Sequence, residues 1–200
     1  MTYEEFLALP ENHNNMIYEW INGQVVKMAR PIVQHQKVCD NLVKFFGLYL
    51  TGKNCKLYSA IDVQLSEAGD PSHVSPDLCV ICGINDSTIK RYIGAPELCI
   101  EILSSNKDHD LITKKRLYLE NGVKEYWIVD HVNKSILVNI FTQGTYETKL
   151  YENGIFYSSL FPTYPIELKT VFEEITVAET IEYLKRLLDI LQKECDSNDV

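Results

Sequence analysis

The 200-residue sequence contains no apolar stretch that approaches the ~20 residues a membrane-spanning helix requires. It also contains no internal repeat and no low-complexity tract. Its first residues, MTYEEFLALPE, are acidic and lack the basic start that is typical of a signal peptide. We therefore expect a cytoplasmic globular protein that has no membrane partner.

Basic residues are scarce as well. The chain has 19 Lys and Arg residues against 28 Asp and Glu residues, which gives a net charge of −9 and argues mildly against a nucleic-acid partner. Between residues 107 and 124 the balance reverses, with five basic residues against three acidic ones. No helix-turn-helix or zinc-finger spacing appears, so any DNA sequence preference would have to come from loops of the core domain.

Six cysteines are present, at positions 39, 55, 79, 82, 99 and 195. Because the sequence shows no export signal, we expect reduced and mostly buried thiols. Cys79 and Cys82 form a CxxC motif inside the apolar run DLCVIC, which is typical of a strand. Residues three apart on a strand point to opposite faces, so these two thiols are predicted to be structural and not a joint metal site.

The hydrophobic periodicity predicts one mixed α/β (α+β) domain, with β-hairpins turning at Asn22-Gly23 and near Gln143-Gly144. Residues 56–66 and 76–82 are typical of strands. Residues 97–130 are typical of a strand–helix–strand unit, whose two strands should be parallel with a right-handed crossover. A helical stripe follows residue 31 and consists of His35, Val38, Leu42, Phe45 and Tyr49.

The C-terminal segment is predicted to be a helix that starts at Thr176, where Glu179 completes a capping box. Its apolar residues alternate at spacings of four and three: Val177, Ile181, Leu184, Leu188 and Leu191. This stripe is expected to dock either on the domain or on a second subunit, so a homodimer is one prediction. We divide the chain into a domain at 1–172 and a C-terminal amphipathic helix with a polar tail at 173–200.

Two carboxylates interrupt apolar strands of the predicted sheet. Asp77 opens the run PDLCVIC, and Glu101 lies in the middle of ELCIEILS. If these strands are neighbours, the two like charges meet, and one pKa rises unless a cation lies between them. Oxygen ligands from Asp and Glu suit Mg²⁺ or Mn²⁺, and such a metal can assist hydrolysis of a phosphodiester.

A lysine follows on the next predicted helix. Asp110 and Lys114 are four residues apart and therefore share one face of that helix. The short connection from residue 104 to 107 turns this helix back across the sheet, so Lys114 is predicted to reach the carboxylate pair. Lys115 points about 100° away by helix geometry and is the weaker candidate.

The sequence resembles the Uma-type restriction endonuclease family of the PD-(D/E)XK nuclease-like superfamily over roughly residues 2–172. The resemblance is carried by YEWINGQVV, by SPDLCVI and PELCIEILS, and by DLITKKRLYLENGVKEYWIVD. It implies a restriction-endonuclease-like fold, in which helices flank a central mixed sheet that bears a metal site. It also implies a DNA substrate and a Mg²⁺ cofactor, with Mn²⁺ as an alternative.

Residue by residue, the resemblance implies that Asp77 and Glu101 hold the metal and that Lys114 supplies the catalytic lysine. The lysine two positions after the glutamate is absent, because Ile102 and Leu103 follow Glu101, and Lys114 on the helix takes its place. The resemblance further assigns to the site Glu19, before the first hairpin turn, and His35, at the start of the helix. Ser105 stands where the family usually has proline.

Structural interpretations stay open beside the catalytic ones. Glu101 could pair with a lysine or an arginine in the core, and His35 could be a buried, hydrogen-bonded core histidine. The other histidines, His13, His73, His109 and His131, are predicted to lie at the surface. The two function hypotheses are therefore a metal-dependent DNA endonuclease and a catalytically silent nuclease-like module for binding or dimerisation.

Overall fold

The structure is a computed structural model, and it describes residues 1–9, 17–28, 30–66, 71–84, 86, 88–104 and 107–198. The sequence expectations for His13 and Ser105 fall outside these residues. Among the described residues, no helix is both long and apolar enough to cross a membrane.

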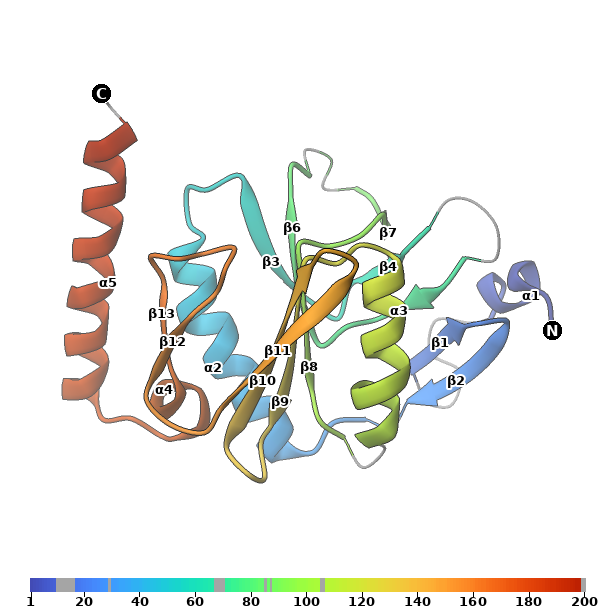
Figure 1. Ribbon diagram of the computed structural model, residues 1–200, viewed down its shortest axis with the longest axis horizontal. Coiled ribbons are helices and arrows are strands. Elements are labelled where there is room, and N and C mark those ends of the chain that lie inside the picture. Colours follow the sequence, from blue (N-terminus) through green and yellow to red (C-terminus); the bar gives the residue numbers. More distant parts are fainter. Residues whose placement is uncertain are drawn as a thin grey trace.

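A six-stranded mixed sheet forms the centre of the molecule (Figure 1). Its strands are, in spatial order, β11 (Thr145–Tyr151), β10 (Ser135–Thr142), β9 (Glu125–Asp130), β8 (Leu98–Ile102), β6 (Leu78–Cys82) and β3 (Cys55–Ser59). Only the β8–β9 pair is parallel, and the other four pairs are antiparallel. The predicted strand–helix–strand unit and the mixed character of the sheet are therefore confirmed.

A second sheet of five strands lies beside the N-terminus (Figure 1). Its order is β2 (Gln24–Met28), β1 (Ile17–Ile21), β5 (His73–Val74), β4 (Asp62–Gln64) and β7 (Arg91–Ile93). The predicted hairpin joins β1 to β2. Asn22 and Gly23 both have positive φ angles, of 50° and 76°, which is the combination that a two-residue type I′ turn requires.

Residues 56–66, which were predicted as one strand, contribute to both sheets. β3 ends at Ser59, Ala60 takes a positive φ of 48°, and β4 begins at Asp62. The left-handed conformation of Ala60 redirects the chain from the six-stranded sheet to the five-stranded one. Alternation of apolar residues cannot reveal such a break, because both pieces keep the same period.

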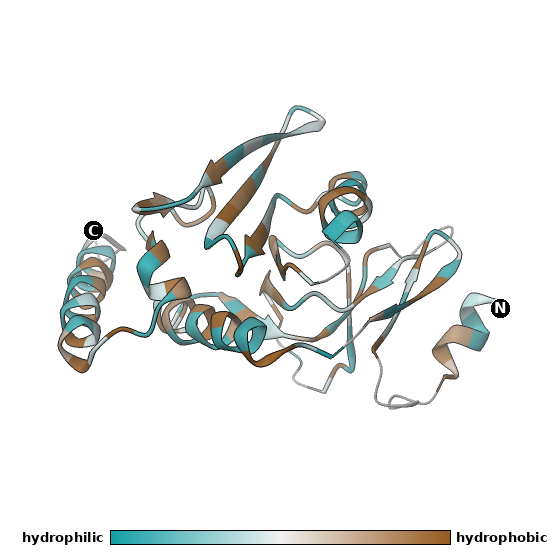
Figure 2. Cartoon of the chain, turned by 90° about the horizontal axis from the view of Figure 1, so that it is seen from below, coloured by the Kyte–Doolittle hydropathy of each residue, from teal (hydrophilic) through white to brown (hydrophobic). Residues whose placement is uncertain are grey.

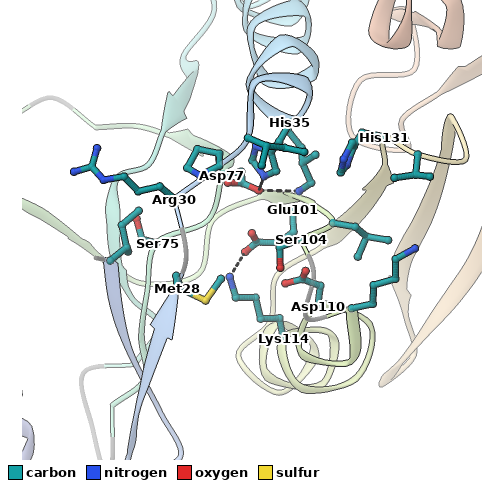
Figure 3. A pocket seen from close by; sticks show the side chains of 17 residues that line it. Met28, Arg30, His35, Ser75, Asp77, Glu101, Ser104, Asp110, Lys114 and His131 are labelled. Atoms are coloured by element: carbon teal, nitrogen blue, oxygen red, sulfur yellow. Dashed lines mark hydrogen bonds and ion pairs between the residues drawn. The ribbon is translucent and has the colours of Figure 1, made fainter. Parts of the chain in front are cut away.

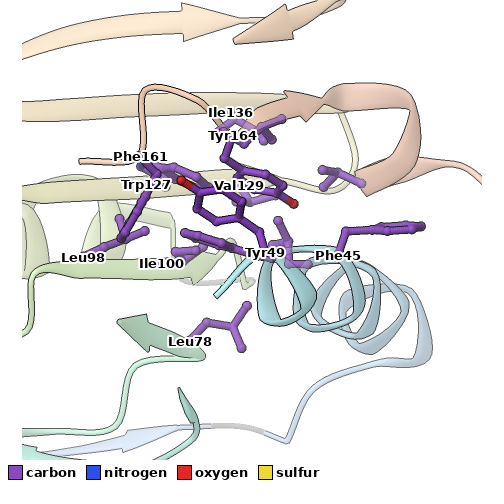
Figure 4. Close-up of a cluster of buried hydrophobic side chains, with 14 of the residues drawn as sticks. Phe45, Tyr49, Leu78, Leu98, Ile100, Trp127, Val129, Ile136, Phe161 and Tyr164 are labelled. Carbon is purple, nitrogen blue, oxygen red and sulfur yellow. The ribbon is translucent and has the colours of Figure 1, made fainter. Parts of the chain in front are cut away.

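Helices cover both faces of the central sheet. On one face, α2 (Val33–Tyr49), α4 (Leu168–Phe172) and α5 (Val177–Asn198) pack with the short strands β12 (Ile155–Tyr157) and β13 (Pro165–Glu167). Figure 4 shows the cluster of buried hydrophobic side chains there, which includes Trp127. The ring of Phe46 stacks on that of Trp127 with 5.9 Å between their centroids. On the other face lies the helical segment η2 (His109–Lys114) and α3 (Lys115–Glu120), and α1 (Tyr3–Leu7) flanks the second sheet. The predicted stripe from His35 to Tyr49 is buried as expected.

The C-terminal helix α5 begins with the predicted capping box, in which Glu179 N donates to Thr176 Oγ1 and Thr176 N donates to Glu179 Oε2. Tyr183 and Leu187 bury it against the main core. The predicted stripe is only partly covered, because Val177, Ile181 and Leu188 are exposed. Figure 2 shows apolar and polar residues alternating along this helix. Docking of the stripe on a second subunit stays a prediction.

The expectation that all cysteines are reduced is wrong for one pair. β3 and β6 are antiparallel neighbours whose register places Cys55 directly opposite Cys82, and a disulfide joins them. The remaining cysteines, Cys39, Cys79, Cys99 and Cys195, are free. Cys79 and Cys82 do point to different surroundings, so the CxxC motif is not a joint site. The sequence could not reveal the pair, because the register between these strands is set by tertiary pairing.

Thiol titration tests this disulfide. We expect four reactive thiols in the denatured, unreduced protein and six after reduction, because only Cys55 and Cys82 are joined. A Cys55→Ser variant should then show five thiols without reduction, because Cys82 becomes free. Six thiols in the unreduced wild-type protein would contradict the assignment.

Candidate active site

Four of the sequence-predicted residues, His35, Asp77, Glu101 and Lys114, line one cavity of about 420 Å³ at the end of the central sheet (Figure 3). Residues of the helix α2, of both sheets and of the η2 segment line it. Its polar lining consists of Arg30, His35, Ser75, Asp77, Glu101, Ser104, Lys107, Asp110, Lys114 and His131. Its apolar lining includes Ile17, Met28, Ile32, Ile102 and Val132. A small apolar-walled space with converging charged groups is the usual form of a binding or active site.

Asp77 and Glu101 lie on adjacent strands, as the sequence predicted. In the antiparallel β6–β8 pair, Leu78 is opposite Ile100, so Asp77 comes opposite Glu101 one step further along. Residues opposite each other in a sheet share one face, and both side chains open into the cavity. The backbone N–H of Ile102 donates to Asp77 Oδ2 at 2.8 Å, which fixes the Asp77 carboxylate against the edge of β8.

Lys114 fills the space between two carboxylates. Its Nζ lies 2.8 Å from Glu101 Oε1 and 3.0 Å from Glu19 Oε1, and its side chain has no exposed surface. Tyr118 Oη also donates to Glu101 Oε1, at 2.8 Å. Lys114 is therefore the lysine that reaches the site, whereas Lys115 Nζ donates to Thr148 on β11. The ion-pair interpretation of Glu101 is thus confirmed, and the same side chain also lines the cavity.

The helix that carries Lys114 is wider than the sequence predicted. Residues His109–Lys114 form a π-helical segment, which continues as the α-helix α3. This segment buries His109, Asp110 and Lys114, whereas the apolar side chain of Leu111 is 36 % exposed. Short π-helical segments are rare and occur frequently at functional sites. Here the extra width turns polar side chains, not apolar ones, toward the sheet.

Glu19 reaches the site from the second sheet. Its side chain is fully buried and accepts a hydrogen bond from Ser75 N at 3.0 Å. His109 Nε2 lies 3.4 Å from Glu19 Oε2. The prediction that His109 and His73 lie at the surface is wrong, because they are only 8 % and 6 % exposed. His109 had no ligand-like spacing in the sequence, since its partner is distant in the chain.

His35 completes the set from the first turn of α2. Its Nε2 lies 3.2 Å from Asp77 Oδ2, so it is both a buried core histidine and a neighbour of the predicted metal ligand. Burial favours its neutral form, but the Asp77 carboxylate outweighs this and raises the pKa of His35. The ring of His131 meets it edge to face at 6.3 Å and lines the same cavity. His131 is a further residue that the sequence interpretation placed at the surface.

The two glutamates that contact Lys114 have pKa values shifted in opposite directions. Burial raises the pKa of Glu101 to about 8; the ammonium of Lys114 opposes this shift, whereas Asp77, Asp110 and Glu19 add to it. Burial acts on Glu19 as well, but Lys114 and the hydrogen bonds from His109 and Ser75 lower its pKa to about 2. Despite burial, the neighbouring carboxylates raise the pKa of Lys114. The cluster therefore contains the buried ammonium of Lys114 and the carboxylate of Glu19, which is ionised at neutral pH.

The donor set for a cation is small. Protein hydrogen bonds and ion pairs engage Glu101 Oε1 and Asp77 Oδ2, and among the described residues no such contact involves Glu101 Oε2 or Asp77 Oδ1. Within the same residues, no group of three or more His, Cys, Asp or Glu side chains is arranged to hold a metal ion. Two carboxylates with water and substrate phosphate oxygens are, however, a common way to bind Mg²⁺.

The sequence profile of the Uma2 family, which is described as "Putative restriction endonuclease", matches residues 3–174. The chain belongs to the Uma2 family. This finding confirms the resemblance from the sequence, and the match spans both sheets and every residue of the candidate site.

Two known proteins are similar to this Uma2 family member. A crystal structure of a "putative nuclease belonging to DUF820" from Anabaena variabilis superposes with a TM-score of 0.72 at 21% sequence identity, covering 86% of this chain and 97% of that one. This likeness confirms the expected fold. An uncharacterized protein of Synechocystis sp. is 27% identical over 135 residues, which are 66% of this chain and 70% of that protein.

Substitution of Lys114 in this Uma2 family member tests whether the lysine is buried between the two glutamates. We expect Lys114→Ala to lower the free energy of unfolding by about 3–5 kcal/mol, because Glu19 and Glu101 would stay buried without their shared cation. Lys115→Ala is the matched control, and its effect should be below about 1 kcal/mol. Urea unfolding of the metal-free proteins measures both, and equal effects would contradict the buried arrangement.

Proposed function

We propose that this protein is a metal-dependent endonuclease that hydrolyses DNA phosphodiester bonds. The observation that carries the proposal is the pairing of Asp77 with Glu101 at the floor of one cavity, with a buried lysine against Glu101. Membership of a family described as a restriction endonuclease supports it. The structural neighbour from Anabaena variabilis is likewise described as a nuclease.

In this proposal the carboxylates of Asp77 and Glu101 would hold a Mg²⁺ or Mn²⁺ ion. When bound, the ion would supply a more acidic water and a positive charge beside the phosphate. Lys114 keeps Glu101 in one orientation through the 2.8 Å contact and adds positive charge where negative charge develops on the phosphate. It also assists in orienting the attacking water.

Glu19 and His35 act through other residues. Glu19 contacts Lys114 and fixes the ammonium from the side opposite Glu101. His35 contacts Asp77 Oδ2 and fixes this carboxylate at the cavity. Both are therefore positioning residues in this proposal. Arg30 and Lys107 line the same cavity and provide positive charge for the flanking phosphates of DNA.

One observation favours the alternative, a nuclease-like module without catalysis. The carboxylates already have protein partners, because Lys114 lies between Glu19 and Glu101 and His35 contacts Asp77. The site therefore does not depend on a metal ion to compensate its carboxylates. A module of this kind would bind nucleic acid or a second subunit through the same surface but would leave the phosphodiester intact.

Calorimetric titration with Mn²⁺ separates the two functions. We expect the wild-type protein to bind the ion, and we expect Asp77→Asn and Glu101→Gln to lose most of that binding. Glu101→Gln should change the free energy of unfolding by less than about 1 kcal/mol near pH 7. The reason is that Glu19 still neutralises Lys114 in this variant, while the repulsion of the Glu101 carboxylate by Asp77, Asp110 and Glu19 is removed. Glu147→Gln, on the exposed β11 strand, is the control.

A nuclease assay completes this test. Plasmid, single-stranded DNA and RNA are incubated with Mg²⁺ or Mn²⁺, and cleavage should require the ion as well as Asp77 and Glu101. If the wild-type protein bound no Mn²⁺, or if Asp77→Asn bound it unchanged, the catalytic proposal would be wrong and the silent module would stand.

A further inference from the structure

A second cavity, of about 290 Å³, adjoins the candidate active site. It lies where α1 and the segment before β7 meet the five-stranded sheet, and its lining includes Phe6, Tyr18, His73, Lys90 and Arg91. Ile17 and Ser75 line both cavities. The two cavities are therefore neighbours that these two residues separate. No part of the proposed catalysis uses this second space.

His73 at the inner side of this cavity carries an unused polar atom. The residue is 6 % exposed, and its Nε2 lies 3.4 Å from Asp62 Oδ2. Its Nδ1 is buried and has no hydrogen-bond partner among the described residues. A buried polar atom without a partner is destabilising, and native structures usually satisfy it with water or a ligand. Nδ1 is therefore a point at which a polar ligand would gain a contact.

The rim of the second cavity is cationic. Lys90 is exposed, and within the described part of the chain neither Lys90 nor Arg91 forms an ion pair. Arg91 Nη1 is instead held by neutral oxygens, at 3.0 Å from Gln64 Oε1 and 3.3 Å from Tyr3 Oη. Asp62 is the acidic residue of the lining and is engaged with His73. The lining therefore favours an anionic ligand, in a protein whose net charge is −9.

Aromatic rings supply the remaining chemistry. Phe6 and Tyr18 line the cavity, and the ring of Phe6 meets that of His73 edge to face at 5.2 Å. Aromatic side chains combined with a cationic rim are the usual recognition elements for unpaired nucleotides, whose bases stack while their phosphates meet Lys or Arg. A cavity of about 290 Å³ can hold a group of nucleotide size but cannot hold a base pair still stacked in a duplex.

We propose that the second cavity binds one unpaired nucleotide of the substrate, next to the phosphodiester in the candidate active site. The inference deepens the proposed function and rests on it for the identity of the substrate. Its base contacts Phe6, Tyr18 and the free Nδ1 of His73, and its phosphate contacts Lys90. The preferred substrate is then single-stranded DNA, or duplex DNA with unpaired nucleotides beside the cut.

Binding of a fluorescein-labelled short oligothymidylate, measured by anisotropy in EDTA, tests this cavity without cleavage. We expect Lys90→Glu to weaken binding about tenfold and to reduce the salt slope of log K by about 0.7, the value for one phosphate contact on a single strand. The matched control is Lys185→Glu on α5, at the opposite end of the molecule (Figure 1), which should change binding by less than about twofold.

Two further measurements define the outcome. His73→Phe keeps an aromatic ring but removes both ring nitrogens, Nδ1 and the Nε2 that lies 3.4 Å from Asp62 Oδ2. Thermal unfolding shows whether this variant is folded, and we expect weaker binding of the same oligothymidylate. A blunt duplex of equal length should bind less tightly than the single strand. Equal effects of Lys90→Glu and Lys185→Glu, or a duplex that binds as tightly as the strand, would overturn the inference.

The result is distinguishable from failure of the proposed function. If Mn²⁺ binding and cleavage are absent but Lys90→Glu still weakens binding of the strand, the nucleotide cavity stands and the catalytic proposal fails. If the protein cleaves DNA with Mn²⁺ but Lys90→Glu and His73→Phe bind and cleave as the wild type does, the catalytic proposal stands and the nucleotide cavity is wrong.

Discussion

The buried ammonium of Lys114 is the interaction on which the site depends. It contacts Glu101 from the six-stranded sheet and Glu19 from the five-stranded sheet, while its own backbone belongs to the π-helical segment. The two ion pairs of Lys114 therefore require that both sheets and the π-helical segment are packed together. Because an uncompensated buried charge is strongly destabilising, the folded arrangement of the two sheets and the assembly of the site are one event.

The sequence predicted the parts of the site that depend on local pattern. Asp77 and Glu101 interrupt apolar strands, and the four-residue spacing of Asp110 and Lys114 indicated one helix face. The sequence could not show which buried carboxylates are hydrogen-bonded to other side chains and which line a cavity. Glu125 is equally buried in an apolar strand, yet it is satisfied by Trp127 and two serines and lines no part of either cavity. Only tertiary contacts distinguish a structural glutamate from one that lines a cavity.

The same limit explains what the sequence missed in the fold. The periodicity predicted the central sheet, the hairpins and the main helices, because those features repeat within a short stretch of chain. The break at Ala60, the Cys55–Cys82 disulfide and the contact of His109 with Glu19 depend on which distant segments become neighbours. The exposed apolar residues of α5 likewise follow from where Tyr183 and Leu187 attach it, not from its own repeat.

The left-handed residue Ala60 has a consequence for the geometry of the candidate site. Its backbone N–H donates to the carbonyl of Asp77 at 3.2 Å, so the point where the chain leaves one sheet for the other is tied directly to the predicted metal ligand. The backbone of Asp77 is therefore fixed by the same residue at which β3 ends and the chain turns toward β4. The position of this carboxylate in the cavity is thus a property of the junction between the two sheets.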